Sequence, residues 1–161
     1  MNTPPILVMG LGNRLLGDDA VGLVLLEKVS GNGFSRNRLV EFVDGGTQGL
    51  ALLGYLANRK AVVILDAISR GAAPGAVHIL GREQILNLDS DKQCATAHSG
   101  NAGDVLRAAL LTGALPEDTV AIGIEPECLA TQLELSEAAQ GAIEKATEAA
   151  QRTLRDLLSK L

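Results

Sequence analysis

The alternation of short apolar runs with longer stretches of helical periodicity constrains the fold of this chain more than any other feature of its sequence. The runs are short and continuous, a pattern typical of buried strands. Three of them are followed directly by Gly10, Asp44 and Asp66, residues that break or end a strand. Five strands are therefore predicted, at Ile6–Met9, Leu39–Val43, Ala61–Leu65, Ala76–Leu80 and Val120–Ile124.

The stretches between these runs carry helix signals. Asp18 and Asp19 stand before the first helix, where an acidic side chain can cap the helix or face its dipole, and Thr47 is predicted to cap the second. In the last helix, apolar residues recur every three or four positions and form one apolar face. Residues 82–99 are polar and irregular, and such a long connection is typical of a functional segment. The predicted helices are Ala20–Val29, Gln48–Ala57, Asp104–Leu111 and Ser136–Leu161.

Strands that alternate with helices indicate a three-layer α/β/α fold. We expect a single domain over residues 1–161, with a mainly parallel, twisted five-stranded sheet. The fourth strand can be antiparallel, because its connection from the third is too short for a crossover helix. Sheets of this kind place their sites just beyond the carboxyl ends of the strands.

Composition narrows the classes of function. The chain has 161 residues, 47% of them hydrophobic, which suits one folded domain with its own core. Aromatic residues make up 2%, so a stacking platform for single-stranded nucleic acid is not expected. The net charge is −5 and no basic stripe is visible, which argues against binding to a phosphate backbone. We expect no nucleic-acid partner.

The N-terminal residues and the cysteines indicate the compartment. Met1 to Pro5 contain no basic residue and lead into an apolar run too short for a signal peptide or a membrane span. Cys94 and Cys128 have no CxxC neighbour, so free thiols in a reducing compartment are the simplest interpretation, although the sequence leaves a disulfide open. We expect a cytoplasmic protein without a membrane partner.

Polar residues follow the predicted strands at the points where those strands end. Because the carboxyl ends of parallel strands meet at one edge of a sheet, these residues are expected to converge there. They form four groups: Asn13 to Asp19; Asp44, Gly45, Gly46 and Thr47; Asp66; and Glu125.

Asp66 is the strongest candidate for function in these groups. It ends the most hydrophobic run, and a carboxylate there needs a partner, a metal or water, because an unpaired buried charge is costly. Local sequence alone explains Asp18 and Asp19 better as solvated acids at a helix start. His98 lies among small residues that leave its imidazole accessible, whereas packing inside a strand explains His78. Two carboxylates and an imidazole from these groups make a set of oxygen and nitrogen ligands that suits nickel or zinc, with positions left open, although the local pattern does not establish such a site.

Other chemistries receive less support. Gly10 to Asn13 follow a strand, as a dinucleotide-binding loop does, but Leu15 replaces the third glycine and the helix begins late. A nucleotide-binding α/β enzyme stays as an alternative. No GxSxG elbow, HExxH helix or catalytic Cys–His signature is present. No catalytic residue is therefore assigned.

Five stretches, spread in order over nearly the whole chain, resemble the motifs of the hydrogenase maturation endopeptidases. In that family an acid at the end of the first motif, an Asp after the third strand and a His in the long loop bind metal. The resemblance places these roles on Asp19, Asp66 and His98, and substrate recognition on the glycine-rich stretch from Asp44. The stretches are GLGNRLLGDD at Gly10–Asp19, VDGGTQG at Val43–Gly49, LDA at Leu65–Ala67, His98, and GIEPE at Gly123–Glu127.

The resemblance implies an endopeptidase that removes the C-terminal extension of a nickel–iron hydrogenase large subunit after nickel insertion. The partner is then the large-subunit precursor, and the recognised metal is the nickel of that precursor, for which zinc or another divalent ion can substitute. Asn13 and Glu125 are accessory candidates. The alternative is a non-cleaving, metal-dependent chaperone or checkpoint module for the same precursor.

Overall fold

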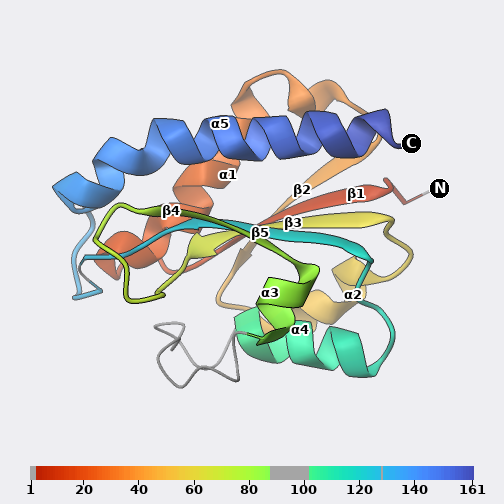
Figure 1. Ribbon diagram of the computed structural model, residues 1–161, viewed down its shortest axis with the longest axis horizontal. Coiled ribbons are helices and arrows are strands. Elements are labelled where there is room, and N and C mark those ends of the chain that lie inside the picture. The colour runs from red at the N-terminus through yellow and green to blue at the C-terminus, as the bar shows by residue number, and fades with distance from the viewer. Residues whose placement is uncertain (1–2, 88–101, 128) are drawn as a thin grey trace.

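A five-stranded sheet forms the centre of the molecule, shown in Figure 1. The computed structural model describes residues 3–87, 102–127 and 129–161. In spatial order the strands are β2-β1-β3-β5-β4; all neighbours are parallel except β4 and β5, which are antiparallel. The mainly parallel five-stranded sheet is thereby confirmed. The strands are β1 (Ile6–Leu11), β2 (Val40–Gly46), β3 (Ala61–Ala67), β4 (Val77–Gly81) and β5 (Asp118–Ile124).

Helices cover both faces of the sheet, as Figure 1 shows, and complete the predicted three layers. One face is covered by α1 (Val21–Gly31) and α5 (Glu137–Ser159). The other is covered by a 3-10 turn at Gly49–Leu52 and by α2 (Leu53–Leu56), α3 (Arg82–Asn87) and α4 (Ala102–Leu111). Two further 3-10 turns occupy Gly17–Ala20 and Phe34–Arg36.

The two-sided cover explains why the central strands are apolar without alternation. In β3, Val63 and Leu65 pack in the layer of α1 and α5, while Val62 and Ile64 pack on the opposite face. Successive side chains of a strand point to opposite faces, so a strand between two helical layers needs an apolar residue at every position. Asp66 is the one residue of β3 that is not fully buried.

Two predicted segments differ from the structure. The helix expected over 48–57 is divided into a 3-10 turn and the single α-helical turn of α2, and Thr47 is not its cap, because Gln48 holds the cap position without a side-chain bond. Gly49 has a φ of +58°, which interrupts a regular helix start. The segment expected to be irregular over 82–99 begins with α3, which buries Ile85 while the Gln84 side chain accepts a hydrogen bond from the Gly81 N–H at 2.9 Å.

Asp18 is not a solvated acid or a cap of the first helix. Ala20 holds the N-cap position of α1 without a side-chain bond. Asp18 is fully buried; its Oδ1 accepts from the Ser136 N–H at 2.7 Å, and its Oδ2 accepts from the Glu127 N–H at 2.8 Å and the Ser136 hydroxyl at 2.7 Å. Ser136 in turn caps α5 by accepting from the Ala139 N–H at 3.1 Å. The Asp18 carboxylate therefore connects the start of α5 to the 3-10 turn that precedes α1.

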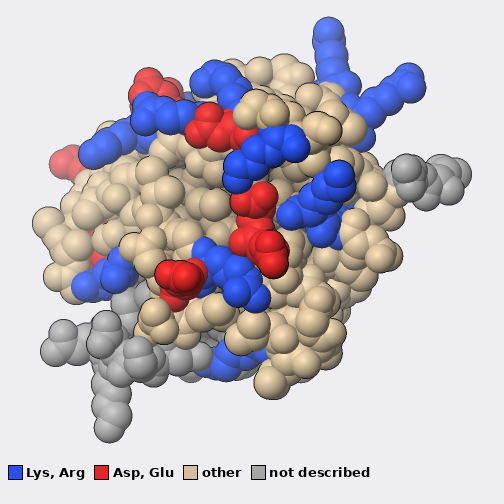
Figure 2. Space-filling view, turned by 45° about the vertical axis from the view of Figure 1, so that its right-hand side comes forward, with Lys and Arg blue, Asp and Glu red and all other residues tan. Residues whose placement is uncertain are grey.

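The face in Figure 2 carries basic and acidic side chains interspersed with one another. Ion pairs among the described residues include Lys160 with Asp118, at 2.8 Å, and the largely buried Arg59 with Glu41. Arg59 also donates to the carbonyl oxygens of Tyr55 and Pro4, both at 2.7 Å, so its guanidinium group joins three segments. Within the described residues, no helix is long and apolar enough to cross a membrane.

Candidate functional site

The four groups of polar residues converge at the carboxyl edge of the sheet, as the strand pattern predicts. Because β1, β2, β3 and β5 run in parallel, the residues that follow them share that edge. The register places Gly10 of β1 between Asp44 of β2 and Leu65 of β3, so the loop after β1 starts beside Asp44 and Asp66.

Asp19 is held at this edge by the loop after β1. The residue is 4% exposed, and its Oδ2 accepts a hydrogen bond from the Asn13 N–H at 2.8 Å. The Asn13 side chain folds the loop itself, because its Oδ1 accepts from the Leu15 N–H at 2.9 Å. Gly12 has a φ of +131°, and a Cβ added there would lie 1.8 Å from the Asp19 carbonyl oxygen. The glycine thus lets the loop close onto the turn that carries Asp19, and Asn13 shapes that loop.

Asp66 lies beside Asp19 in an environment that favours its neutral form. Its Oδ1 accepts from the Ala67 N–H at 2.8 Å. Burial, and to a lesser extent the negative charge of Asp19, raise the pKa of Asp66 to about 7, while the hydrogen bond from the Ala67 N–H opposes the rise. Two acids in this arrangement share a site that a proton or a cation stabilises. This pair is the most chemically distinctive feature of the described edge.

The Asp44–Thr47 stretch divides into exposed side chains and buried backbone. Asp44 and Thr47 are exposed to solvent. Gly45 is buried, and a Cβ there would lie 2.7 Å from Leu11 Cδ2; Gly46 has a φ of +46° and accepts from the Gly12 N–H at 3.0 Å. Packing against β1 therefore explains Gly45, and the positive φ explains Gly46, while the Asp44 and Thr47 side chains are exposed.

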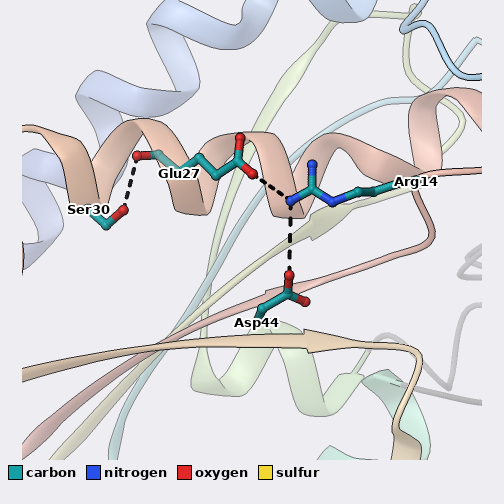
Figure 3. Close-up of polar contacts among 4 residues, drawn as sticks. All are labelled: Arg14, Glu27, Ser30 and Asp44. Atoms are coloured by element: carbon teal, nitrogen blue, oxygen red, sulfur yellow. Dashed lines mark hydrogen bonds and ion pairs between the residues drawn. The ribbon is translucent and has the colours of Figure 1, made fainter.

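Arg14 connects Asp44 to α1, as Figure 3 shows. Its guanidinium Nη2 lies 2.6 Å from Glu27 Oε1 and 4.0 Å from Asp44 Oδ2. The Glu27 carbonyl oxygen accepts from the Ser30 hydroxyl at 3.0 Å, which belongs to the same helix. All three charged side chains are substantially exposed, so we expect this contact to orient Asp44 more than it stabilises the fold.

Glu125 is buried rather than open at the edge. Both of its carboxylate oxygens accept from the Arg70 N–H, at 3.1 and 2.9 Å, and Oε2 lies 2.7 Å from His78 Nε2. The interpretation of His78 as a packing residue was therefore incomplete, since its ring makes a specific polar contact. No local pattern reveals it, because His78 and Glu125 meet only through the pairing of β4 with β5.

The third predicted ligand, His98, lies outside the described residues, as do Cys94 and Cys128. Within the described ranges, no group of three or more His, Cys, Asp or Glu is arranged to hold a metal ion. The described edge thus contributes the two carboxylates of Asp19 and Asp66. Two oxygen donors with a shared negative charge fit a divalent cation, but they fill only part of a coordination sphere.

Comparison with known proteins identifies the family of this chain. The family model for hydrogenase maturation protease (HycI) matches residues 25–153. The chain is 38% identical over 152 residues to the hydrogenase 2 maturation protease of Escherichia coli strain K12, an alignment that covers 94% of this chain and 91% of that protein. Two solved structures are also similar.

The hydrogenase maturating endopeptidase HybD from E. coli has a TM-score of 0.79 at 34% identity, over 94% of this chain and 92% of that one. The NiFe hydrogenase maturation protease HybD from Thermococcus kodakarensis has a TM-score of 0.74 at 27% identity, over 91% of this chain and 97% of that one. This chain therefore belongs to the hydrogenase maturation protease family and is an endopeptidase.

Proposed function

We propose that this endopeptidase removes the C-terminal extension of a nickel–iron hydrogenase large-subunit precursor after nickel insertion, and that Asp19, Asp66 and His98 recognise the inserted metal. Membership of the family supports the proteolytic step. The observation that carries the metal recognition is the Asp19–Asp66 pair, in which burial and the neighbouring charge raise the pKa of Asp66 to about 7.

The electrostatics of the pair favour a cation. Ionising Asp66 beside Asp19 is costly in the metal-free protein, because both charges are poorly solvated. A divalent ion removes that cost by neutralising both carboxylates, and near pH 7 it displaces a proton that is only weakly held. The repulsion between the two carboxylates therefore favours the binding of a cation.

The three proposed ligands do not fill the coordination sphere of the metal. Two carboxylates and one imidazole leave coordination positions open on nickel, and the precursor that already holds the nickel supplies the rest. The protease then binds loaded precursor in preference to unloaded precursor, so that cleavage follows insertion. Nickel is cargo of the substrate, and zinc or another divalent ion can substitute in the isolated protein. Metal recognition, more than bond cleavage, is the role we give to these three residues.

Substrate recognition extends along the edge. The exposed Asp44 and Thr47 contact the precursor, while Gly45 and Gly46 keep the backbone of β2 close to β1. Asn13 supports Asp19 through the loop after β1. We expect the reaction to take place in the cytoplasm.

The experiment is to incubate purified protein with nickel-loaded and with nickel-free precursor and to follow loss of the C-terminal peptide by intact mass. We expect cleavage of the loaded precursor alone, and loss of cleavage in Asp66→Asn and in His98→Ala. Asp156→Asn is the matched control, because this acid is exposed on α5. Equal cleavage of both precursors, or normal cleavage by either site variant, would refute metal recognition. Complex formation without shortening would favour the checkpoint alternative.

A further inference from the structure

The buried carboxylate of Glu125 joins three segments of the chain at the edge of the sheet. Its side chain is 6% exposed and that of His78 is 13% exposed. The Arg70 N–H donates to both carboxylate oxygens, and His78 Nε2 lies 2.7 Å from Oε2. A carboxylate only accepts hydrogen bonds, so Nε2 carries the proton in this contact. Glu125 follows β5, His78 belongs to β4, and Arg70 lies in the connection between β3 and β4.

The main chain of Glu125 is also fixed. Its N–H donates to the Ala76 carbonyl oxygen at 2.8 Å, and its own carbonyl oxygen accepts from the Gly75 N–H at 2.9 Å. Backbone bonds therefore set where this residue sits, while its side chain reaches sideways to Arg70. Burial of a carboxylate is costly unless hydrogen bonds compensate it, and bonds to an ionised acceptor are about twice as strong as neutral ones.

The segment that Glu125 holds begins at Asp66. The register aligns Asp66 of β3 with Gly123 of β5, and Gly123 with His78 of β4, so these positions share one face of the sheet. Gly123 lacks a side chain, and that of Ile68 takes the space: a Cβ at Gly123 would lie 2.6 Å from Ile68 Cγ1. The Ile68 N–H donates to the Ile124 carbonyl oxygen at 3.1 Å.

Beyond the end of β3, two residues attach the following segment to the end of β5. Ile68 does so through its N–H bond to the Ile124 carbonyl oxygen and its side chain over Gly123, and Arg70 through its N–H bond to Glu125. If the Arg70 attachment is lost, the segment after β3 keeps only the Ile68 contacts, and the Asp66 side chain at the end of β3 loses part of its support. Ligand groups need this support, because outer partners that orient them account for about 10–100-fold in metal affinity or activity.

We propose that Glu125, oriented by His78, is a positioning residue that directs the Asp66 carboxylate toward the metal site through residues 66–70. This inference rests on the proposed role of Asp66 in metal recognition. Glu125 acts through Arg70 and does not contact the metal or the substrate.

Three substitutions separate positioning from general packing. Glu125→Leu removes the acceptor for Arg70, whereas Glu125→Gln keeps it, because the amide oxygen accepts from Arg70 while the amide NH2 faces a His78 ring in its other tautomer. His78→Leu leaves the bond between the Arg70 N–H and Glu125 in place and removes only the contact of the His78 ring with the Glu125 carboxylate. Leu154→Ala is the matched control for lost stability, since Leu154 is fully buried in the layer of α1 and α5.

The measurements use the whole metal-free chain and then Zn²⁺ alone. The Ala67 amide reports the direction of Asp66, to which it donates, and the Arg70 amide reports the bond to Glu125. In Glu125→Leu we expect faster hydrogen exchange at both amides and Zn²⁺ affinity about 10-fold lower by calorimetry. We expect a smaller loss of Zn²⁺ affinity in His78→Leu, and Zn²⁺ affinities within twofold of the unsubstituted chain in Glu125→Gln and Leu154→Ala.

Each outcome bears on one claim. Unchanged Ala67 exchange in Glu125→Leu would overturn the positioning role, and so would an equal loss of Zn²⁺ affinity in Leu154→Ala. If Asp66→Asn binds Zn²⁺ as well as the unsubstituted chain, the proposed metal recognition by Asp66 is wrong. Hydrogen exchange at the Ala67 amide in Glu125→Leu then still decides whether Glu125 directs the Asp66 side chain. If Glu125→Leu does not fold, His78→Leu takes its place with the same criteria.

Discussion

Replacing Asp66 by Asn should stabilise the metal-free protein above neutral pH while it removes processing. Asn keeps the shape of the side chain and an oxygen that can accept from the Ala67 N–H at the position now occupied by Oδ1. It cannot ionise. The substitution therefore isolates the cost of holding a negative charge at this position beside Asp19.

The magnitude follows from the pKa of Asp66, which burial and the Asp19 charge raise from 3.8 to about 7. One pKa unit corresponds to about 1.4 kcal/mol, so the penalty for ionising Asp66 in the folded state has an upper bound of roughly 4 kcal/mol. Asp66 keeps partial access to solvent, which screens the charge, so we expect about half of this value, roughly 2 kcal/mol.

The sign depends on which state binds more protons. Between pH 4 and pH 7 the folded protein holds a proton on Asp66 that the unfolded chain has released, so the contribution of this group to stability falls as the pH rises. It is complete below the unfolded pKa and lost above about pH 7. The Asn variant has no such dependence, and its advantage over the unsubstituted protein grows with pH.

The assay is urea unfolding in the presence of a chelator at pH 5 and at pH 8, with Asp156→Asn as a control that removes an exposed acid. We expect the stability difference between Asp66→Asn and the unsubstituted protein to be roughly 1–2 kcal/mol larger at pH 8 than at pH 5, and no such change in the control. A difference that does not depend on pH, or that shrinks as the pH rises, would refute the reasoning. A variant that is more stable but no longer processes the precursor would show that Asp66 lowers stability in favour of function.

Three further predictions concern the elements that support the edge. Asp18→Ala should cost about 3 kcal/mol in unfolding free energy, because it leaves the buried donors of Ser136 without their acceptor; a loss below about 1 kcal/mol in urea titration would contradict this. Gly12→Ala should cost more than about 2 kcal/mol by the same assay, whereas Gly31→Ala, where an added Cβ meets nothing within 4 Å, should be neutral or slightly stabilising. Arg14→Ala should change stability by less than about 1 kcal/mol, with any effect disappearing in high salt; a larger, salt-independent loss would show that its exposed pair with Glu27 is structural.

The sequence predicts those parts of the candidate site that follow from where the strands end. The runs that end at Asp44 and Asp66 predict parallel strands, and parallel strands bring their carboxyl ends together whatever their order in the sheet. The closeness of Asp19 to Asp66 needed the tertiary structure, because it depends on how Gly12 lets the loop close. Asp18 shows the opposite error: an exposed helix cap was a reasonable local prediction, yet its partner at Ser136 lies 118 positions away.

The sequence by itself determined the α/β/α layers, the mainly parallel sheet and the edge at which the acids of this protease gather, because hydrophobic periodicity and strand polarity are local properties that a chain expresses wherever it packs. Only the tertiary structure decided that Asp66 sits close enough to Asp19 to have its pKa raised, and that Glu125 is buried against His78 and the Arg70 N–H. Those features depend on register between strands and on loop closure. Register and closure are set by contacts between distant residues, which no local pattern records.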